Sequence, residues 1–158
     1  MLAFKEWAYI VQALISGKQQ IILRKGGISE DEKDFILRDK SFLLMPTLFH
    51  QAQHLIKEDW LKFYNENYQL PDNNTFTITH KANVIDFKVI NSLEELLSLN
   101  DLHVWKEDVL LERFNRWQKN TIYCLTVTTE KLENPIILDA QNPEFGGCKS
   151  WIEVNKIH

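Results

Sequence analysis

The chain has 158 residues, 44% of them hydrophobic and 25% charged, a composition typical of one globular domain with a buried core. Its formal net charge is -4, which excludes a global basic field that would draw the protein onto nucleic acid or anionic lipid. Any contact with nucleic acid must therefore come from a local patch.

The N-terminal region is predicted to be a helix followed by a strand. Apolar residues recur every three or four positions from Ala3 to Ser16, the pattern of an amphipathic helix, and Gly17 is suited to end it. Residues 19–24 are rich in β-branched and apolar side chains and predict a short strand. A hairpin across residues 16–18 is the competing interpretation.

Pro46 and Thr47 mark a boundary in the middle of the chain. Residues 42–45 form an apolar run that Pro46 is expected to stop, because proline interrupts regular backbone hydrogen bonding. Thr47 is expected to cap a helix over residues 48–66 and is also a candidate residue of the ligand site. Residues 70–74 are dense in turn formers and predict a loop within the same domain.

The second half is predicted to contain the longest strands. Residues 75–90 alternate in polarity, which predicts one long strand or a bent pair, and Ser92 with Glu95 forms a capping box for the next helix. The predicted elements are helices at 3–16, 48–66, 93–99 and 106–117, strands at 19–24, 42–45, 75–90, 121–129 and 135–138, and a strand or turn at 151–154. Because no βαβ period is visible, this order predicts an α+β fold with a mainly antiparallel sheet or small barrel and helices outside.

Four of the five glycines stand in two adjacent pairs, each close to a basic residue. Gly26 and Gly27 follow Arg24 and Lys25 in the sequence RKGGI. Adjacent glycines let a ligand approach the backbone closely, and successive amide groups can form a nest for an anion. Arg24 offers a planar fork for a phosphate or a base edge, and Lys25 a point charge. The alternative is a turn that ends a strand, with two solvated cations.

The second glycine pair opens the sequence GGCKSW near the other end of the chain. This motif supplies a flexible backbone, a cation, a hydroxyl and an indole, from Gly146, Gly147, Lys149, Ser150 and Trp151. The indole of Trp151 could stack on a base, and the alternative is a core tryptophan after a turn. We expect the two motifs to converge, with Arg24 and Lys149 facing one pocket.

Two residues at the start of the predicted helix 48–66 are further candidates. His50 and Gln51 could donate hydrogen bonds to a phosphate or a base edge. His50 also shares a helix face with His54 and Glu58, a spacing that can hold a metal. Surface or base-contacting histidines are the preferred interpretation, so neither a metal nor another cofactor is predicted.

Three more side chains complete the candidate ligand site. Trp7 and Trp105 are candidates for stacking on a base. Arg113 forms a basic edge with Arg116 and Lys119 on the predicted helix 106–117, and acidic neighbours partly offset the charge of this edge. The alternative for this edge is a solvated helix face.

Cysteine content and hydropathy predict a cytoplasmic protein. Cys124 and Cys148 are far apart in the sequence and do not make a disulfide framework. Cys148 beside a lysine is a candidate nucleophile, although an inert filling residue is the preferred interpretation. We expect neither a signal peptide nor a membrane span, since the apolar runs are much shorter than about 18 residues.

Several short motifs together resemble an uncharacterised bacterial family known as domain of unknown function 1802. These motifs span nearly the whole chain and read FKEWA, RKGGI, FLLMPTLFHQ, HVW, RF and GGCKSW. The family is associated with restriction-endonuclease-like domains. The resemblance therefore implies a nucleic-acid or defence context and a restriction-type partner protein.

A more distant resemblance is to ASCH domains, which belong to the PUA-like β-barrels. Residues 7–24 are similar in layout to the opening helix and GxKTxExR strand of those domains, and VIDFKVINSLEELLSL, ERF and TIYCLTVTTEKLENPI are similar to their later half. PUA-like domains bind RNA or DNA with modified bases, and some small ASCH proteins hydrolyse modified nucleosides. Lys18 and Arg24 match the strand motif, whereas Gln20 and Ile22 stand where Thr and Glu are expected, a departure that weighs against hydrolysis.

Three functions follow as hypotheses. The leading one is a module that binds DNA, RNA or a modified nucleotide through the two glycine motifs and the tryptophans. The second is a small hydrolase acting on a modified nucleoside, with Lys18 and His50 in the site. The third is a scaffold subunit of a restriction or defence complex without a ligand of its own.

Overall fold

The computed structural model describes residues 1–26, 35–48, 53–147 and 149–155. Six strands and four α-helices are present in these ranges, together with four short 3-10 helices. In chain order they are β1 (Leu2–Trp7), α1 (Ala8–Ser16), β2 (Ile21–Arg24), β3 (Ser41–Thr47), η1 (Gln53–Leu55), α2 (Glu58–Asn67), β4 (Thr75–Ile90), α3 (Leu93–Ser98), η2 (Asn100–Leu102), α4 (Glu107–Asn115), η3 (Arg116–Gln118), β5 (Ile122–Asp139), η4 (Pro143–Phe145) and β6 (Trp151–Glu153).

The strands form one sheet in the order β2-β5-β4-β3-β1-β6. The β1–β3 pair is parallel and the other pairs are antiparallel. This arrangement confirms the α+β class with a mainly antiparallel sheet. The sheet is open, with β2 and β6 at its edges, so it does not close into a barrel.

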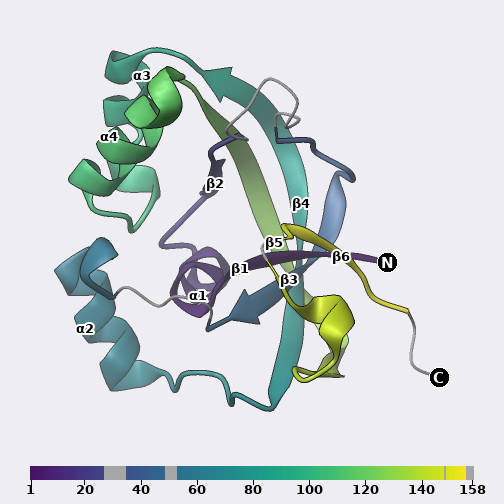
Figure 1. Ribbon diagram of the computed structural model, residues 1–158. Coiled ribbons are helices and arrows are strands. Elements are labelled where there is room, and N and C mark those ends of the chain that lie inside the picture. Colours follow the sequence, from purple (N-terminus) through teal and green to yellow (C-terminus); the bar gives the residue numbers. More distant parts are fainter. Residues whose placement is uncertain (27–34, 49–52, 148, 156–158) are drawn as a thin grey trace.

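Two apolar clusters cover the two faces of the sheet. Figure 1 shows α2, α3 and α4 on one side of β4 and β5, with η4 on the other side. The larger cluster lies on the helix side and includes residues of α1, α2 and α4, among them Tyr9, Trp60 and Phe114. The smaller one joins Phe145 of η4 to residues of β1, β3 and β6.

The predicted N-terminal helix is wrong over its first residues, which form β1. Phe4 pairs with Leu44 of β3 and with Trp151 of β6, so β1 is an inner strand with its hydrogen bonds satisfied on both sides. Partners this distant in sequence override the local helical pattern. From Ala8 the chain is helical, and Gly17 ends α1 in the left-handed conformation with a φ of 80°. The helix end is thus as predicted, and the competing hairpin does not form.

The predicted boundary at Pro46 and Thr47 is also wrong. Both residues belong to β3, where Pro46 pairs with Glu6 of β1. A proline is tolerated there because β4 pairs with residues 41–43 and has left that side of β3 before Pro46. The hydroxyl of Thr47 donates to the carbonyl of Glu6 at 3.2 Å and caps no helix. The helix predicted over residues 48–66 is replaced by η1 and α2, with residues 49–52 outside the described ranges.

The second half follows the sequence pattern more closely. β4 covers the predicted residues 75–90 and has register shifts after Ile78 and Val84, as a bent strand requires. The Ser92 hydroxyl accepts from the backbone N–H of Glu95 at 3.3 Å, which confirms the cap. β5 is one strand rather than the two that were predicted, because β4 pairs with it almost from end to end.

Candidate functional site

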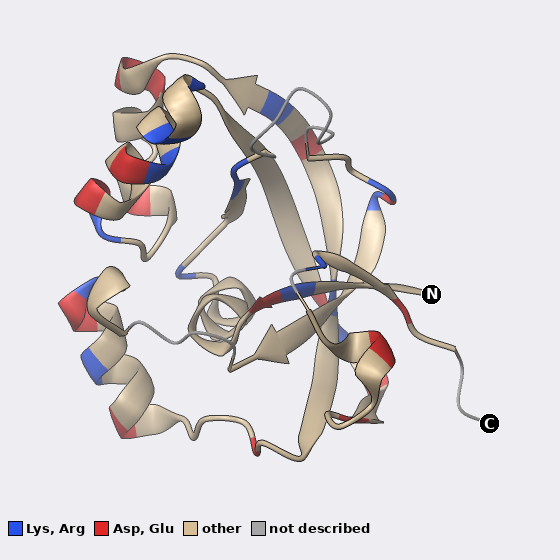
Figure 2. Cartoon of the chain, viewed as in Figure 1, with Lys and Arg blue, Asp and Glu red and all other residues tan. Residues whose placement is uncertain are grey.

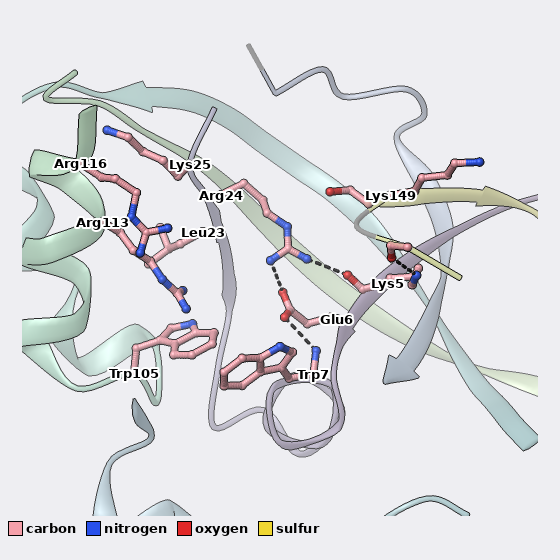
Figure 3. Close-up of a pocket in the computed structure, with 12 residues that line it drawn as sticks. Lys5, Glu6, Trp7, Leu23, Arg24, Lys25, Trp105, Arg113, Arg116 and Lys149 are labelled. Carbon is pink, nitrogen blue, oxygen red and sulfur yellow. Dashed lines mark hydrogen bonds and ion pairs between the residues drawn. The ribbon is translucent and has the colours of Figure 1, made fainter. Parts of the chain in front are cut away.

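A pocket of about 280 Å³ lies where β1, the end of β2, α4 and the loop before β6 meet. Its lining contains six basic side chains and one acidic side chain among the described residues. The basic ones are Lys5, Arg24, Lys25, Arg113, Arg116 and Lys149, the acidic one is Glu6, and the others are Trp7, Leu23, Trp105, Gly147 and Ser150. Figure 3 shows that these side chains come from all four parts of the fold.

The two glycine motifs converge at this pocket. Arg24 and Lys25 line it from the first motif, and Gly147, Lys149 and Ser150 from the second. The predicted convergence is therefore confirmed. Figure 3 adds one qualification, because the Lys149 side chain extends away from Arg24 and Arg113 rather than between them.

Arg24 and Glu6 form the central ion pair of the pocket wall. The guanidinium lies 3.0 Å from Glu6 Oε2 and donates to the Lys5 carbonyl at 2.6 Å. The other carboxylate oxygen of Glu6 accepts from the Trp7 N–H at 2.9 Å, and the carboxylate is only 3% exposed. Arg24 also lies over the ring of Phe4 at 4.5 Å, and its buried Nε has no hydrogen-bond acceptor in the described part of the chain.

The two lysines of the inner wall hold backbone carbonyls. Lys5 Nζ donates to the carbonyls of Phe145 and Gly147, each at 2.8 Å, and so fixes the second glycine motif against β1. Lys25 Nζ donates to the carbonyl of Phe114 in the last turn of α4 and to those of Lys119 and Thr121 beyond its end. Burial, with Arg116 nearby, lowers the pKa of Lys25. Lys25 therefore holds the backbone in place, and it is neither the available point charge of the functional interpretation nor the solvated cation of the alternative.

Arg113 and the two indoles form the opposite wall. The Arg113 guanidinium lies over the Trp105 ring at 4.2 Å, and the Trp7 and Trp105 rings are 5.1 Å apart at a tilt of 57°. Burial, together with the charges of Arg24 and Arg116, lowers the pKa of Arg113, while Glu6 opposes this shift. Trp105 is only 2% exposed, so the less buried Trp7 is the better stacking surface.

Arg116 completes the basic side of the pocket. Its Nε and terminal nitrogen donate to the two oxygens of Glu112 at 2.9 and 2.6 Å, a bidentate pair. This pair raises the pKa of Arg116 and lowers the pKa of Glu112. The next residues, Trp117 and Gln118, both have positive φ values, so the chain turns sharply after this arginine.

Sequence reasoning missed Lys5, Glu6, Leu23 and Arg116 as lining residues. Glu6 and Lys5 were missed because their segment has a helical pattern, whereas their contacts with Arg24, Phe145 and Gly147 join segments that are distant in sequence. The one signal that could have found them is the motif FKEWA, which contains both. Arg116 belongs to the predicted basic edge but was not selected with Arg113.

Other predicted site residues lie apart from this pocket. Thr47 and Gly146 line a neighbouring cavity of about 310 Å³ that shares Lys5 and Gly147 with the pocket. Lys18 lines a different cavity of about 500 Å³ beside Trp60 and Phe63. Gly26 is described but is not in the lining, whereas Gly27, His50 and Gln51 lie outside the described residues.

Trp151 packs inside the protein, as the alternative interpretation stated. Its ring centroid lies 4.9 Å from that of Phe4 and 5.0 Å from that of Phe42. Its Nε1 donates to the Ile36 carbonyl at 3.0 Å. The ring of Trp151 is thus engaged by protein, and Trp7 is the partly exposed indole among the described lining residues of the pocket.

The described residues contain no group of three or more His, Cys, Asp or Glu side chains placed to hold a metal ion. In the same ranges, no helix is both long enough and apolar enough to cross a membrane.

Burial raises the pKa of the Cys124 thiol to about 11, which makes it a poor nucleophile.

Comparison with solved structures places the fold among ASCH proteins. The crystal structure of an ASCH protein from Zymomonas mobilis superposes with a TM-score of 0.59 and 12% identity, over 98% of this chain and 87% of the other. Crystal structures of two mutant forms of that protein give TM-scores of 0.60 and 0.58 at 13% and 11% identity, over 98% of this chain and 90% and 88% of theirs. This likeness confirms the predicted ASCH-type, PUA-like architecture.

Sequence comparison gives the family. No curated protein sequence matches the chain. The profile of the family described as Domain of unknown function (DUF1802) matches residues 3–157, nearly the full length. The chain therefore belongs to the DUF1802 family, as its motifs predicted.

Proposed function

We propose that the protein is a binding module for nucleic acid or a modified nucleotide, and that the ligand enters the pocket between β1, β2, α4 and the second glycine motif. The observation that carries this proposal is the local charge. Among the described residues, six basic side chains and one acidic side chain line the pocket, in a chain with 18 basic and 22 acidic residues in all. A protein with a net charge of -4 concentrates its cations here.

The groups around the pocket match the two parts of a nucleotide. Arginine presents a rigid fork of N–H donors that fits phosphate oxygens, and Arg113 and Arg116 come from one wall. An indole offers a flat face to a base, and such stacking contributes about 1–3 kcal/mol per base. Trp7 provides that face beside the arginines.

The fold supports the same proposal. The chain shares its architecture with ASCH proteins, and PUA-like domains as a class bind RNA or DNA with modified bases. At 11–13% identity the likeness concerns the fold alone, so the pocket residues themselves carry the argument.

Fluorescence anisotropy with short single- and double-stranded DNA and RNA tests the proposal at low and moderate salt. We expect binding that weakens with salt, because neutralised phosphates release counterions. Arg113→Gln should weaken binding about tenfold or more, since a charged hydrogen bond is lost. Lys18→Gln is the matched control, because it removes a cation at a different cavity and should leave binding unchanged. Absence of salt-sensitive binding to every strand would reject the nucleic-acid part of the proposal.

The hydrolase and scaffold functions stay predictions. Lys18, the lysine suggested for hydrolysis, lies in the cavity beside Trp60 rather than among the converging cations. A restriction-type partner would need an exposed apolar surface, and Ile85 and Val89 on β4 with Leu93 on α3 are among the exposed apolar residues of the described chain. Pull-down with wild-type protein and an Ile85→Asp variant separates this function from ligand binding.

A further inference from the structure

Most cations of the pocket are already paired with groups of the protein. Lys5 and Lys25 donate to carbonyls, Arg24 pairs with Glu6, and Arg116 pairs with Glu112. These contacts neutralise or occupy the charged heads. The anion-binding capacity of the inner pocket therefore depends on the cations that remain.

Among the described lining residues, two cations remain whose charged head groups have no hydrogen-bond or ion-pair partner, Arg113 and Lys149, and the Lys149 side chain extends away from the inner pocket. Within the described ranges the Arg113 guanidinium makes no hydrogen bond or ion pair and rests on the Trp105 ring. The neighbouring guanidiniums of Arg24 and Arg116 repel it, and the carboxylates of Glu6 and Glu112 attract it. Three guanidiniums near two carboxylates leave one positive charge in excess, which an anionic ligand would balance.

The size and position of the pocket limit the ligand to one nucleotide unit. The volume of about 280 Å³ is at the lower end for small-molecule sites, which are roughly 300–1,000 Å³. Trp7 and Arg113 both line this volume, so a base on the indole and a phosphate on the guanidinium would belong to the same nucleotide. A continuous strand would have to enter and leave through the surrounding surface.

That surrounding surface is unfavourable to a long polyanion. Figure 2 shows acidic residues on α2, α3 and α4 and around η4, with basic residues between them on α2 and α4. Because six basic residues lie in the pocket, the rest of the chain is more acidic than its net charge of -4 indicates. Repulsion from this surface disfavours extended strands and favours a short ligand or a strand end.

We propose, building on the function proposed above, that the pocket recognises a nucleotide unit that bears a terminal phosphate monoester, with the phosphate on Arg113 and the base on Trp7. A monoester carries a charge of about -1.5 to -2 and three free acceptor oxygens, which suits an arginine with unused donors better than an internal diester does. The same chemistry is offered by a free nucleoside monophosphate and by a phosphorylated strand end.

The test compares ten-nucleotide strands that differ only at one end. One pair of strands is labelled with fluorescein at the 3′ end and carries either a 5′ hydroxyl or a 5′ phosphate. A second pair is labelled at the 5′ end and carries either a 3′ hydroxyl or a 3′ phosphate. An internally labelled circular strand, which has no end, is the reference. We expect one phosphorylated end to bind about tenfold or more tightly than its hydroxyl form in anisotropy. Unlabelled nucleoside monophosphate should compete, and the nucleoside should compete far less.

Three variants assign the effect to the pocket. Arg113→Gln should abolish the preference for phosphate, Trp7→Leu should weaken the monophosphate and the nucleoside alike, and Lys18→Gln should change neither. Circular dichroism establishes that each variant is folded. If monophosphate competes while neither phosphorylated end is preferred, the source is the free nucleotide and the chemistry holds.

Equal binding of hydroxyl-ended, phosphorylated and circular strands, with the monophosphate competing no better than the nucleoside, would overturn the monoester proposal while leaving nucleic-acid binding intact. Binding of no strand and no nucleotide would overturn both proposals. A phosphate preference that survives Arg113→Gln would also overturn the assignment, because the phosphate would then be held elsewhere.

Discussion

At the scale of single residues, Glu6 organises the wall of the pocket. Its buried carboxylate holds the Arg24 guanidinium with one oxygen and the Trp7 N–H with the other. The two residues that it contacts, Trp7 and Arg24, both line the pocket. Glu6 thus positions the pocket without being placed to bind an anion itself.

Glu6→Ala should lower the free energy of unfolding by about 3 kcal/mol, because the Arg24 guanidinium then has no carboxylate to pair with. Urea unfolding of both proteins measures the difference. Glu112→Ala is the control, since it breaks an exposed pair with Arg116 and should cost less than about 1 kcal/mol. Equal losses of unfolding free energy in the two variants would show that the buried Glu6 pair stabilises the protein no more than the exposed Glu112 pair.

At the scale of elements, local pattern was sufficient where neighbours in sequence decide the structure. The Ser92 cap and the Gly17 helix end depend on bonds over three or four residues, and both were predicted. β1 depends on β3 and β6, which local pattern cannot reveal. Pro46 was misread for the same reason, because its tolerance depends on where β4 leaves β3.

The loop before β6 offers a test of backbone conformation at the pocket. Gly147 has a φ of 78° with open space around an added Cβ, so Gly147→Ala should cost about 1 kcal/mol from backbone strain alone. Gly146→Ala should be nearly neutral, since its φ is -78° and the added Cβ would only touch the Pro143 carbonyl at 3.4 Å. Urea unfolding of the two variants makes the comparison, and a larger loss at Gly146 would contradict it.

At the scale of the whole molecule, the site was predicted in part. Charge and glycine placement were sufficient to select Arg24, Gly147 and Lys149, and the fold does bring these motifs together. The sequence could not show that Lys25 braces backbone carbonyls or that Trp151 packs against Phe4, because those contacts join distant segments. Lys18 was selected by a motif match, but the fold places it at another cavity.

The stability of the molecule should fall as the pH drops from about 6.5 to 4. His103 is buried, and burial lowers its pKa from 6.5 to about 4, while its Nδ1 accepts from the Trp105 N–H. In this range the unfolded chain binds a proton that the folded protein does not, so protonation favours unfolding, by up to about 3 kcal/mol at pH 4. Urea unfolding across this range measures the loss.

His103→Asn provides the comparison for this pH dependence, since its side-chain oxygen can also accept from Trp105. The variant should lose less stability than wild type between pH 6.5 and 4. The difference between the two profiles isolates His103 from His80, whose pKa burial also lowers. Parallel profiles would show that His103 is not the group responsible.

The pairing of β1 with β6 has a consequence for the biosynthesis of the protein. Lys5 precedes by 140 residues the Phe145 carbonyl that it holds, and Phe4 pairs with Trp151. Translation adds about 5–20 residues per second, so a nascent chain waits on the order of ten seconds between making one wall of the pocket and making the other. During that interval Arg24 and Glu6 can already meet, while the second glycine motif is still to be translated. Ligand binding is therefore expected to begin only after residue 151 has left the ribosome.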